Sequence, residues 1–161
     1  MEQPSRKNLR LENYDYSKPG SYFVTVCTKD KKCILSTIVG ADAHIGPHPV
    51  LSQEGMIVEK YLRNIPGLGS YVIMPNHIHM ILHIFAESLL QGPVWASAPV
   101  RVNISQMIRS FKILVTKELG HSIWHRSYYD HIIRDERDYQ IRARYIEENP
   151  SKWFFDDYYV P

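Results

Sequence analysis

The sequence is poor in cysteine: Cys27 and Cys33 are its only two thiols. Two cysteines cannot form a zinc site by themselves, and we expect both to be reduced and partly buried beside a strand. No apolar run approaches the roughly 18 residues that span a membrane. The first ten residues also lack the apolar centre of a secretory signal. These absences favour a cytoplasmic protein without a membrane partner.

The sequence also lacks a strong net charge, at +2 with a pI near 8.5. Such mild basicity permits a nucleic-acid partner, but any contacts to phosphates must be local. Repeats and low-complexity tracts are absent, and 161 residues suffice for one hydrophobic core. We therefore expect a single domain over residues 1–161, with a basic N-terminal arm over 1–12 and a flexible loop over 86–102.

Hydrophobic periodicity and turn residues predict strands mixed with helices. Asn103 and Asp135 are suited to cap two of the helices, and Gly120 and Pro150 to end them. The pattern predicts an α+β fold in which helices cover an antiparallel sheet. Expected strands cover residues 22–28, 33–35 (returning from the first as a hairpin), 71–85 and 124–134. Expected helices cover 51–64, 104–119 and 136–148, and 39–49 reads as a loop.

Three histidines fall on one face of the strand expected at 71–85. Side chains alternate along a strand, so His77, His79 and His83 oppose an almost wholly apolar even-numbered set. Imidazoles two residues apart, at about 6.5 Å along the backbone, can converge on one divalent cation. Pro75, which has no N–H, favours a sheet edge or a bulge just before them. Partly exposed histidines without a metal are the alternative, and a third ligand must come from elsewhere.

The last expected helix brings together a tyrosine and an amide. Tyr145 and Asn149 are one turn apart, whereas Tyr139, Ala143 and Ile146 cluster on the side expected to pack on the sheet. A phenol beside an amide oxygen suits a nucleophile next to a metal ligand. The alternative is a tyrosine at a helix–sheet contact and an asparagine that ends the helix before Pro150.

The combined motifs resemble the single-tyrosine HUH transposases, in the branch associated with repetitive extragenic palindromes (REP). The resemblance runs from about residue 10 to 153. It is carried, in this order, by residues 10–25, the metal motif at 74–79 (MPNHIH), the helix segment at 110–117, and two C-terminal blocks at 124–136 and 145–150.

This resemblance implies a ferredoxin-like fold, a divalent metal such as Mg²⁺ or Mn²⁺, and hairpin-containing single-stranded DNA as the substrate. It maps His77, His79 and Asn149 onto the metal ligands and Tyr145 onto the nucleophile. The implied reaction cuts and rejoins DNA through a 5′-phosphotyrosine intermediate without ATP. It leaves open the general base, the DNA sequence recognised and the choice between a monomer and a homodimer that exchanges tyrosines.

Basic and aromatic residues supply candidate DNA contacts. The arm residues Arg6, Lys7 and Arg10 can hold phosphates, although short charged termini are commonly just solvated. Lys112, Arg134 and Arg142 are further candidates, and ion pairs with Asp138 or Glu148 are the alternative for the two arginines. Trp124 and Tyr128 can stack on bases or pack in the core.

Two other functions fit parts of the pattern. A DNA-binding module that has lost cleavage would keep the fold, although every expected catalytic residue is present. A small-molecule hydrolase could use His77, His79 and His83, but it gives the pairing of Tyr145 with Asn149 no purpose.

Overall fold

The computed structural model describes residue 15 and residues 18–40, 46–85 and 103–161. Its main sheet has four strands in the order β4-β5-β1-β6, and every neighbouring pair is antiparallel. The strands are β1 (Gly20–Cys27), β4 (Leu68–Ile73), β5 (His77–Ile84) and β6 (Tyr129–Ile133). A separate ribbon pairs β2 (Ser36–Val39) with β3 (His48–Leu51).

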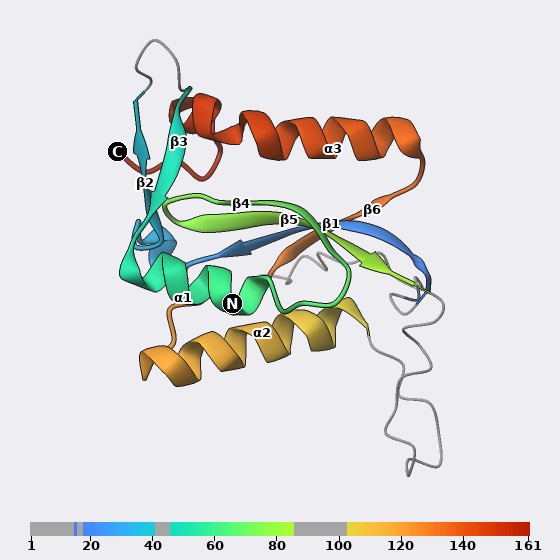
Figure 1. Cartoon of the computed structure of the whole chain (residues 1–161), viewed down its shortest axis with the longest axis horizontal. Helices are drawn as coiled ribbons and strands as arrows, with labels where there is room; N and C mark the ends of the chain where they lie inside the picture. Colours follow the sequence, from blue (N-terminus) through green and yellow to red (C-terminus); the bar gives the residue numbers. More distant parts are fainter. Residues whose placement is uncertain (1–14, 16–17, 41–45, 86–102) are drawn as a thin grey trace, which may run out of the picture.

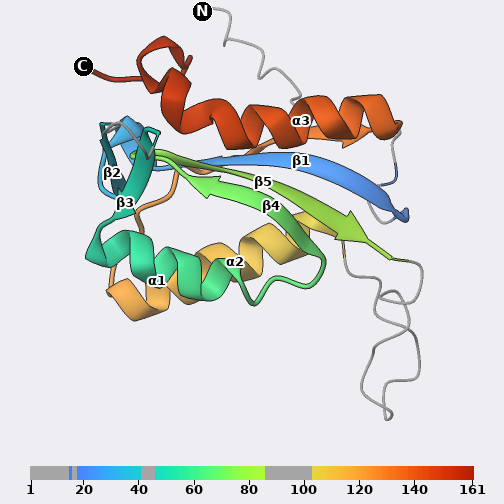
Figure 2. The ribbon, with the colours of Figure 1, turned by 45° about the horizontal axis from the view of Figure 1, so that its top comes forward.

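Three α-helices cover the two faces of this sheet. Helices α1 (Gln53–Leu62) and α2 (Ile104–Leu119) lie on one face and α3 (Glu136–Glu148) on the other (Figures 1 and 2). A short 3-10 segment, η3 (Asn149–Phe155), continues from α3, and another, η1 (Lys29–Lys31), follows β1. The sheet order, with β1-α1-β4-β5-α2-β6 along the chain, confirms the expected ferredoxin-like α+β class.

Local capping explains why α2 and α3 match their predicted bounds. Asn103 and Gln106 form a reciprocal capping box, and Gly120 ends α2 in the left-handed conformation. Asp135 accepts a hydrogen bond from the Asp138 backbone N–H at the start of α3. Capping hydrogen bonds and the conformation of Gly120 therefore set the bounds of the two helices.

Other predicted bounds were wrong. The expected strand 71–85 is a hairpin, because residues 74–76 turn between β4 and β5. Residues 33–35 form no strand, and β1 pairs with β5 and β6 instead. The loop expected at 39–49 contains the start of β3, and the helix expected from residue 51 begins at Gln53. The strand expected at 124–134 is shorter: Trp124 makes only an isolated bridge to Thr28, and β6 begins at Tyr129.

The alternation predicted for the histidine strand is confirmed for β5. Its even residues, Ile78 to Ile84, join the core beneath α1 and α2. Ile81 lies on the other face, in a smaller core with Phe23, Ile146 and Trp153, against which Tyr139 and Ala143 pack. Pro75 was expected at a sheet edge or a bulge; the edge is not found, since β5 lies between β4 and β1, and Pro75 lies in the turn between β4 and β5. The histidines are therefore covered by α3 rather than open at an edge.

Part of the expected organisation falls on the undescribed ranges. The arm over residues 1–12 and the loop over 86–102 lie outside the described residues. Within the part of the chain that is described, no helix has the length and apolar character needed to cross a bilayer.

Gly67, at the turn before β4, has no space for a side chain. Its φ is +74°, and a Cβ would lie 2.0 Å from the His83 carbonyl oxygen. Backbone strain and this clash lead us to expect that Gly67→Ala lowers the free energy of unfolding by about 2–4 kcal/mol. Urea denaturation measures the loss. Gly40→Ala is the matched control, because nothing lies within 4 Å of its Cβ position; equal stability of the two variants would contradict the prediction.

Candidate metal centre and tyrosine

Two histidines of β5 lie side by side beneath α3. The ring centroids of His77 and His79 are 4.4 Å apart, and the two side chains are 0% and 1% exposed. The Nδ1 atom of His79 shares a 2.8 Å hydrogen bond with Thr25 Oγ1, across the β1–β5 pairing. The sheet therefore fixes the orientation of this ring.

Asn76 fixes the tautomer of His77. The Asn76 amide nitrogen donates to the carbonyl oxygens of Tyr158 (2.8 Å) and Lys31 (3.3 Å), so its Oδ1 must be an acceptor. His77 Nδ1 donates to that oxygen at 2.8 Å. A neutral ring with its proton on Nδ1 presents the Nε2 lone pair, which is the atom a metal needs.

Burial keeps both imidazoles neutral. It lowers the pKa of His77 to about 4, although the nearby charge of Asp156 opposes the shift. Burial, with the neighbouring His77, lowers the pKa of His79 well below its usual value. Both rings are therefore unprotonated at neutral pH, and a cation need not displace a proton from them.

Asn149, at the end of α3, has its side-chain amide next to His77. Its side chain is 1% exposed, and its Nδ2 donates to Asp156 Oδ2 at 2.9 Å. That bond leaves Oδ1 as the free end of the amide. Among the described residues, Asn149 Oδ1, His77 Nε2 and His79 Nε2 are buried without hydrogen-bond partners. Unpaired buried polar atoms are costly, so a shared ligand is the expected compensation.

Asp156 is a site residue that sequence reasoning missed. Ligand atoms of His77, His79 and Asp156 all lie within 4.8 Å of one another. Asp156 follows η3, where no periodic pattern remains to place it. Imidazole nitrogens and an amide oxygen, with a carboxylate close by, form a site that fits a divalent cation.

Tyr145 lies beside the histidines of its own chain. Its ring centroid is 5.1 Å from that of His79, and its hydroxyl donates to Asp156 Oδ2 at 3.4 Å. The side chain is 38% exposed, so a large substrate can reach it. Burial and the charge of Asp156 raise the pKa of Tyr145 to about 12, and the phenol therefore needs activation to act as a nucleophile.

A second tyrosine flanks the pair from the C-terminal segment. The Tyr158 ring lies 4.6 Å from His77, and burial raises its pKa to about 12. Its proximity makes it the natural comparison for Tyr145, although the sequence motif does not include it.

The structure does not bring all of the other predicted site residues to this centre. His83 bonds to Ser21 Oγ at 2.8 Å and is outside the His77–His79–Asp156 cluster, so the three-histidine centre does not form. Arg142 lies over the Phe23 ring at 5.4 Å and 3.4 Å from Asp138, whereas Arg134 is exposed. Lys112 donates to the backbone oxygens of His125 and Ser127 on the opposite layer. Arg6, Lys7 and Arg10 lie outside the described residues.

Thr25 provides a test of how His79 is oriented. We expect Thr25→Val to weaken Mn²⁺ affinity about 10–100-fold, because outer partners of metal-bound histidines have effects of that size. Isothermal titration with Mn²⁺ measures the change. Ser21→Ala removes a hydroxyl–imidazole bond of the same 2.8 Å length from His83, outside the cluster, and should leave the affinity unchanged. Equal losses in both variants would contradict the assignment.

The fold of the chain resembles that of a solved transposase. A solved REP-associated tyrosine transposase, bound to a REP hairpin, superposes with a TM-score of 0.60 at 21% identity, covering 89% of this chain and 73% of the other. That likeness concerns the fold. No family model matches the sequence.

Two proteins of Haemophilus influenzae are similar in sequence. An uncharacterised one is 32% identical over 96% of this chain and 93% of its own length. Another, assigned provisionally as a REP-associated tyrosine transposase, is 24% identical over 88% of this chain and 77% of its own. The chain belongs to the same family as the first of these proteins, and it is similar to the REP-associated tyrosine transposases in sequence and in fold.

Proposed function

We propose that the chain is a metal-dependent endonuclease and strand transferase for single-stranded DNA, acting through a 5′-phosphotyrosine on Tyr145. Hairpin-containing repeat DNA is the proposed substrate. One observation carries the proposal. The Tyr145 ring lies 5.1 Å from His79, and His77, His79 and Asn149 each have a buried ligand atom without a hydrogen-bond partner among the described residues. A centre that served only structure would have no need of a phenol open to solvent.

The proposed ligands are His77 Nε2, His79 Nε2 and Asn149 Oδ1. A bound Mg²⁺ or Mn²⁺ would supply electrostatic stabilisation of charge on the scissile phosphate. Asn76 and Thr25 hold the two imidazoles in orientation, and α3 carries Asn149 and Tyr145 on neighbouring turns. The protein's own contribution is thus a fixed placement of the nucleophile relative to its ligands.

The bond changes centre on the Tyr145 oxygen. This oxygen attacks phosphorus, a new oxygen–phosphorus bond forms, and the bond from phosphorus to the 3′ oxygen breaks. The products are a 5′-phosphotyrosine and a 3′-hydroxyl that takes up one proton. Because the phosphodiester is conserved in the link to tyrosine, attack by a 3′-hydroxyl reverses the step and joins strands.

Asp156 is the proposed acceptor of the Tyr145 proton, since the phenol already donates to its Oδ2. We expect Asp156→Asn to slow adduct formation about 100-fold at neutral pH, even with Mn²⁺ at saturation. Raising the pH should recover part of the rate, because hydroxide then ionises the phenol. An adduct rate equal to that of the parent at saturating Mn²⁺ would contradict the role of Asp156 as base.

DNA positioning is proposed for Arg134, just before α3, for Arg142 within α3, for Lys112, and for the arm residues Arg6, Lys7 and Arg10. Arg142 lies on Phe23, whose ring also contacts His79 and Tyr145, so its guanidinium is next to the centre. Of these basic residues, we expect Arg142 to lie nearest to the scissile strand.

The experiment is covalent capture. The protein is mixed with Mn²⁺ and a hairpin oligonucleotide with flanking single strands, labelled on its 3′ side, and then resolved under denaturing conditions. The proposal expects a labelled protein band, its loss with a chelator, and a DNA-linked peptide that contains Tyr145. Binding without any adduct across a panel of hairpins would favour a DNA-binding module that has lost cleavage.

A further inference from the structure

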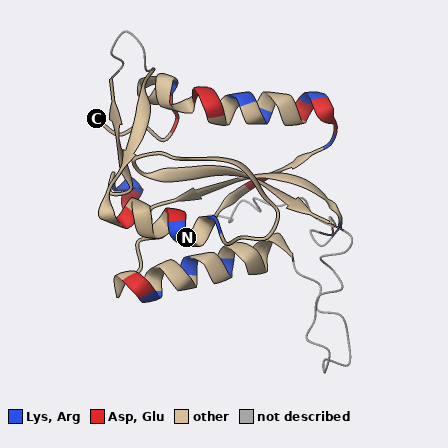
Figure 3. Cartoon of the chain, in the orientation of Figure 1, with Lys and Arg blue, Asp and Glu red and all other residues tan. Residues whose placement is uncertain are grey.

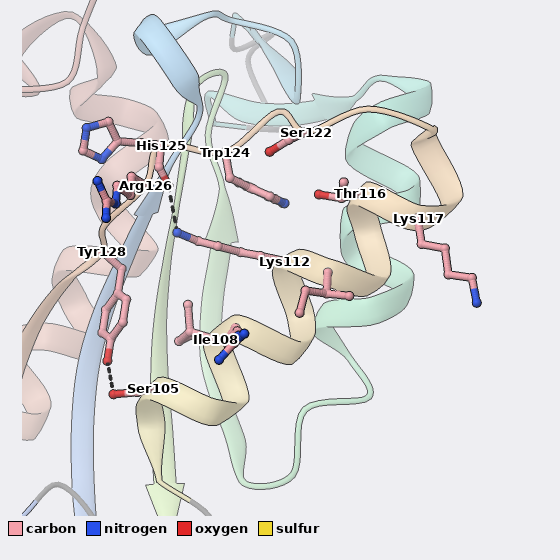
Figure 4. Close-up of a pocket in the computed structure, with 12 residues that line it drawn as sticks. Ser105, Ile108, Lys112, Thr116, Lys117, Ser122, Trp124, His125, Arg126 and Tyr128 are labelled. Carbon is pink, nitrogen blue, oxygen red and sulfur yellow. Dashed lines mark hydrogen bonds between the residues drawn. The ribbon is translucent and has the colours of Figure 1, made fainter.

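A groove lies on the opposite layer from Tyr145, between α2 and residues 122–128. It has a volume of about 820 Å³. Its helical wall follows one stripe of α2, through Ser105, Ile108, Lys112 and Thr116, and the other wall carries Trp124 and Tyr128 (Figure 4). Pockets of roughly 300–1,000 Å³ hold small ligands, so a nucleotide can fit.

The charge of this groove has one sign. Four of its twelve lining residues are cations and none is acidic: Arg109, Lys112, Lys117 and Arg126. The whole chain has a net charge of only +2, whereas the charged residues of α2 are cations except for Glu118 near its end (Figure 3). Such a local field suits a polyanion.

Lys112, unlike the other three cations, bridges the two walls of the groove. Its Nζ donates to the backbone oxygens of His125 (2.9 Å) and Ser127 (3.1 Å), which fixes the facing wall against α2. Arg109, Lys117 and Arg126 are exposed at the rim, where phosphates can reach them. The groove therefore has a held shape and a basic rim.

Trp124 gives the groove an apolar surface and one buried hydrogen-bond donor. Trp124 is 6% exposed, packs on Phe111 at 5.4 Å, and its Nε1–H is buried without a hydrogen-bond partner among the described residues. Figure 4 shows the indole nitrogen directed between α2 and the facing wall. Because indole can only donate, the unpaired group calls for an acceptor oxygen or nitrogen.

We propose that this groove binds an unpaired nucleotide segment of the DNA, with phosphates on Arg109, Lys117 and Arg126 and a base acceptor on Trp124 Nε1. The inference rests on the proposed function for its choice of nucleic acid. An unpaired strand is favoured over a duplex, because apolar floors and buried donors contact exposed bases, which pairing hides. Cleavage on the α3 layer and strand holding on the α2 layer are thus separate surfaces.

Fluorescence anisotropy without metal tests the groove independently of cleavage. We expect Arg109→Glu with Lys117→Glu to weaken binding of a labelled 12-nucleotide single strand at least about tenfold. The slope of log affinity against log salt should fall by about 1.4, or about 0.7 for each lost phosphate contact. Lys18→Glu with Lys32→Glu changes the charge equally outside the groove and should lower affinity less than about twofold. Equal losses in both pairs would overturn the proposal.

Two further measurements separate the remaining outcomes. Trp124→Phe keeps a ring but removes the donor, and we expect a severalfold loss of affinity with the melting temperature largely retained. A blunt duplex that binds as tightly, with the same dependence on the groove, would overturn the assignment to unpaired DNA. Adduct formation by the parent protein is scored separately: its absence, with groove-dependent binding intact, contradicts the proposed function and leaves the groove standing.

Discussion

Tyr145→Phe is expected to abolish the covalent protein–DNA adduct, with a loss of about a thousandfold or more, equivalent to ~4 kcal/mol of transition-state stabilisation. The substitution removes one oxygen, which is the atom that would bond to phosphorus. The ring contacts with His79 and Phe23 can stay in place. Denaturing gels with 3′-side-labelled hairpin DNA measure the adduct, and anisotropy checks that binding is retained.

Tyr158→Phe is the matched control. Tyr158 is also half-buried, also has its pKa raised to about 12, and its ring lies closer to His77 (4.6 Å) than to His79 (5.9 Å). We expect this variant to form adduct at a rate within a few-fold of the parent. Adduct that persists in the Tyr145 variant and disappears in the Tyr158 variant would assign the nucleophile to the C-terminal segment instead.

His79→Ala should remove both metal binding and metal-dependent stabilisation. In the parent, Mn²⁺ at 100 times its dissociation constant should stabilise the fold by about 2.7 kcal/mol, seen as a rise in melting temperature. With one imidazole gone, we expect no such rise and adduct formation at least about 100-fold slower. This loss is larger than the roughly 10–100-fold effect that we expect from replacing a residue, such as Thr25, that only hydrogen-bonds to a metal ligand.

His83→Ala provides the comparison on the same strand and the same face. His83 contacts Ser21 and lies near Tyr139, outside the cluster, so its loss should leave the response to Mn²⁺ intact. If both histidine variants lost the response, the metal would be held differently from the arrangement proposed. If neither did, the centre would not be a metal site.

Sequence reasoning was most successful where local chemistry decides structure. The capping residues Asn103 and Asp135 define α2 and α3, and the alternation along β5 separates the histidine face from the main core. It failed where pairing is non-local. Nothing near residues 33–35 reveals that β1 pairs with β5 and β6, and Pro75 proved to be in a turn between two strands.

The candidate site divides in the same way. His77, His79, Tyr145 and Asn149 lie in recognisable motifs, and the structure brings them together. Asp156 could not be found, because its position depends on how the chain folds back after η3. The orientation of Asn76, which sets the His77 tautomer, likewise depends on carbonyls of Lys31 and Tyr158 from distant segments.

The placement of Tyr145 beside the histidines of its own chain has a consequence for the fate of cut DNA. If Tyr145 carries the 5′ end, the freed 3′ end starts within the same molecule, so resealing is intramolecular and is governed by a high effective concentration. An incoming strand has to compete with this 3′ end for the phosphotyrosine. The balance between repair of the nick and exchange of strands would then depend on how firmly the departing 3′ end is retained.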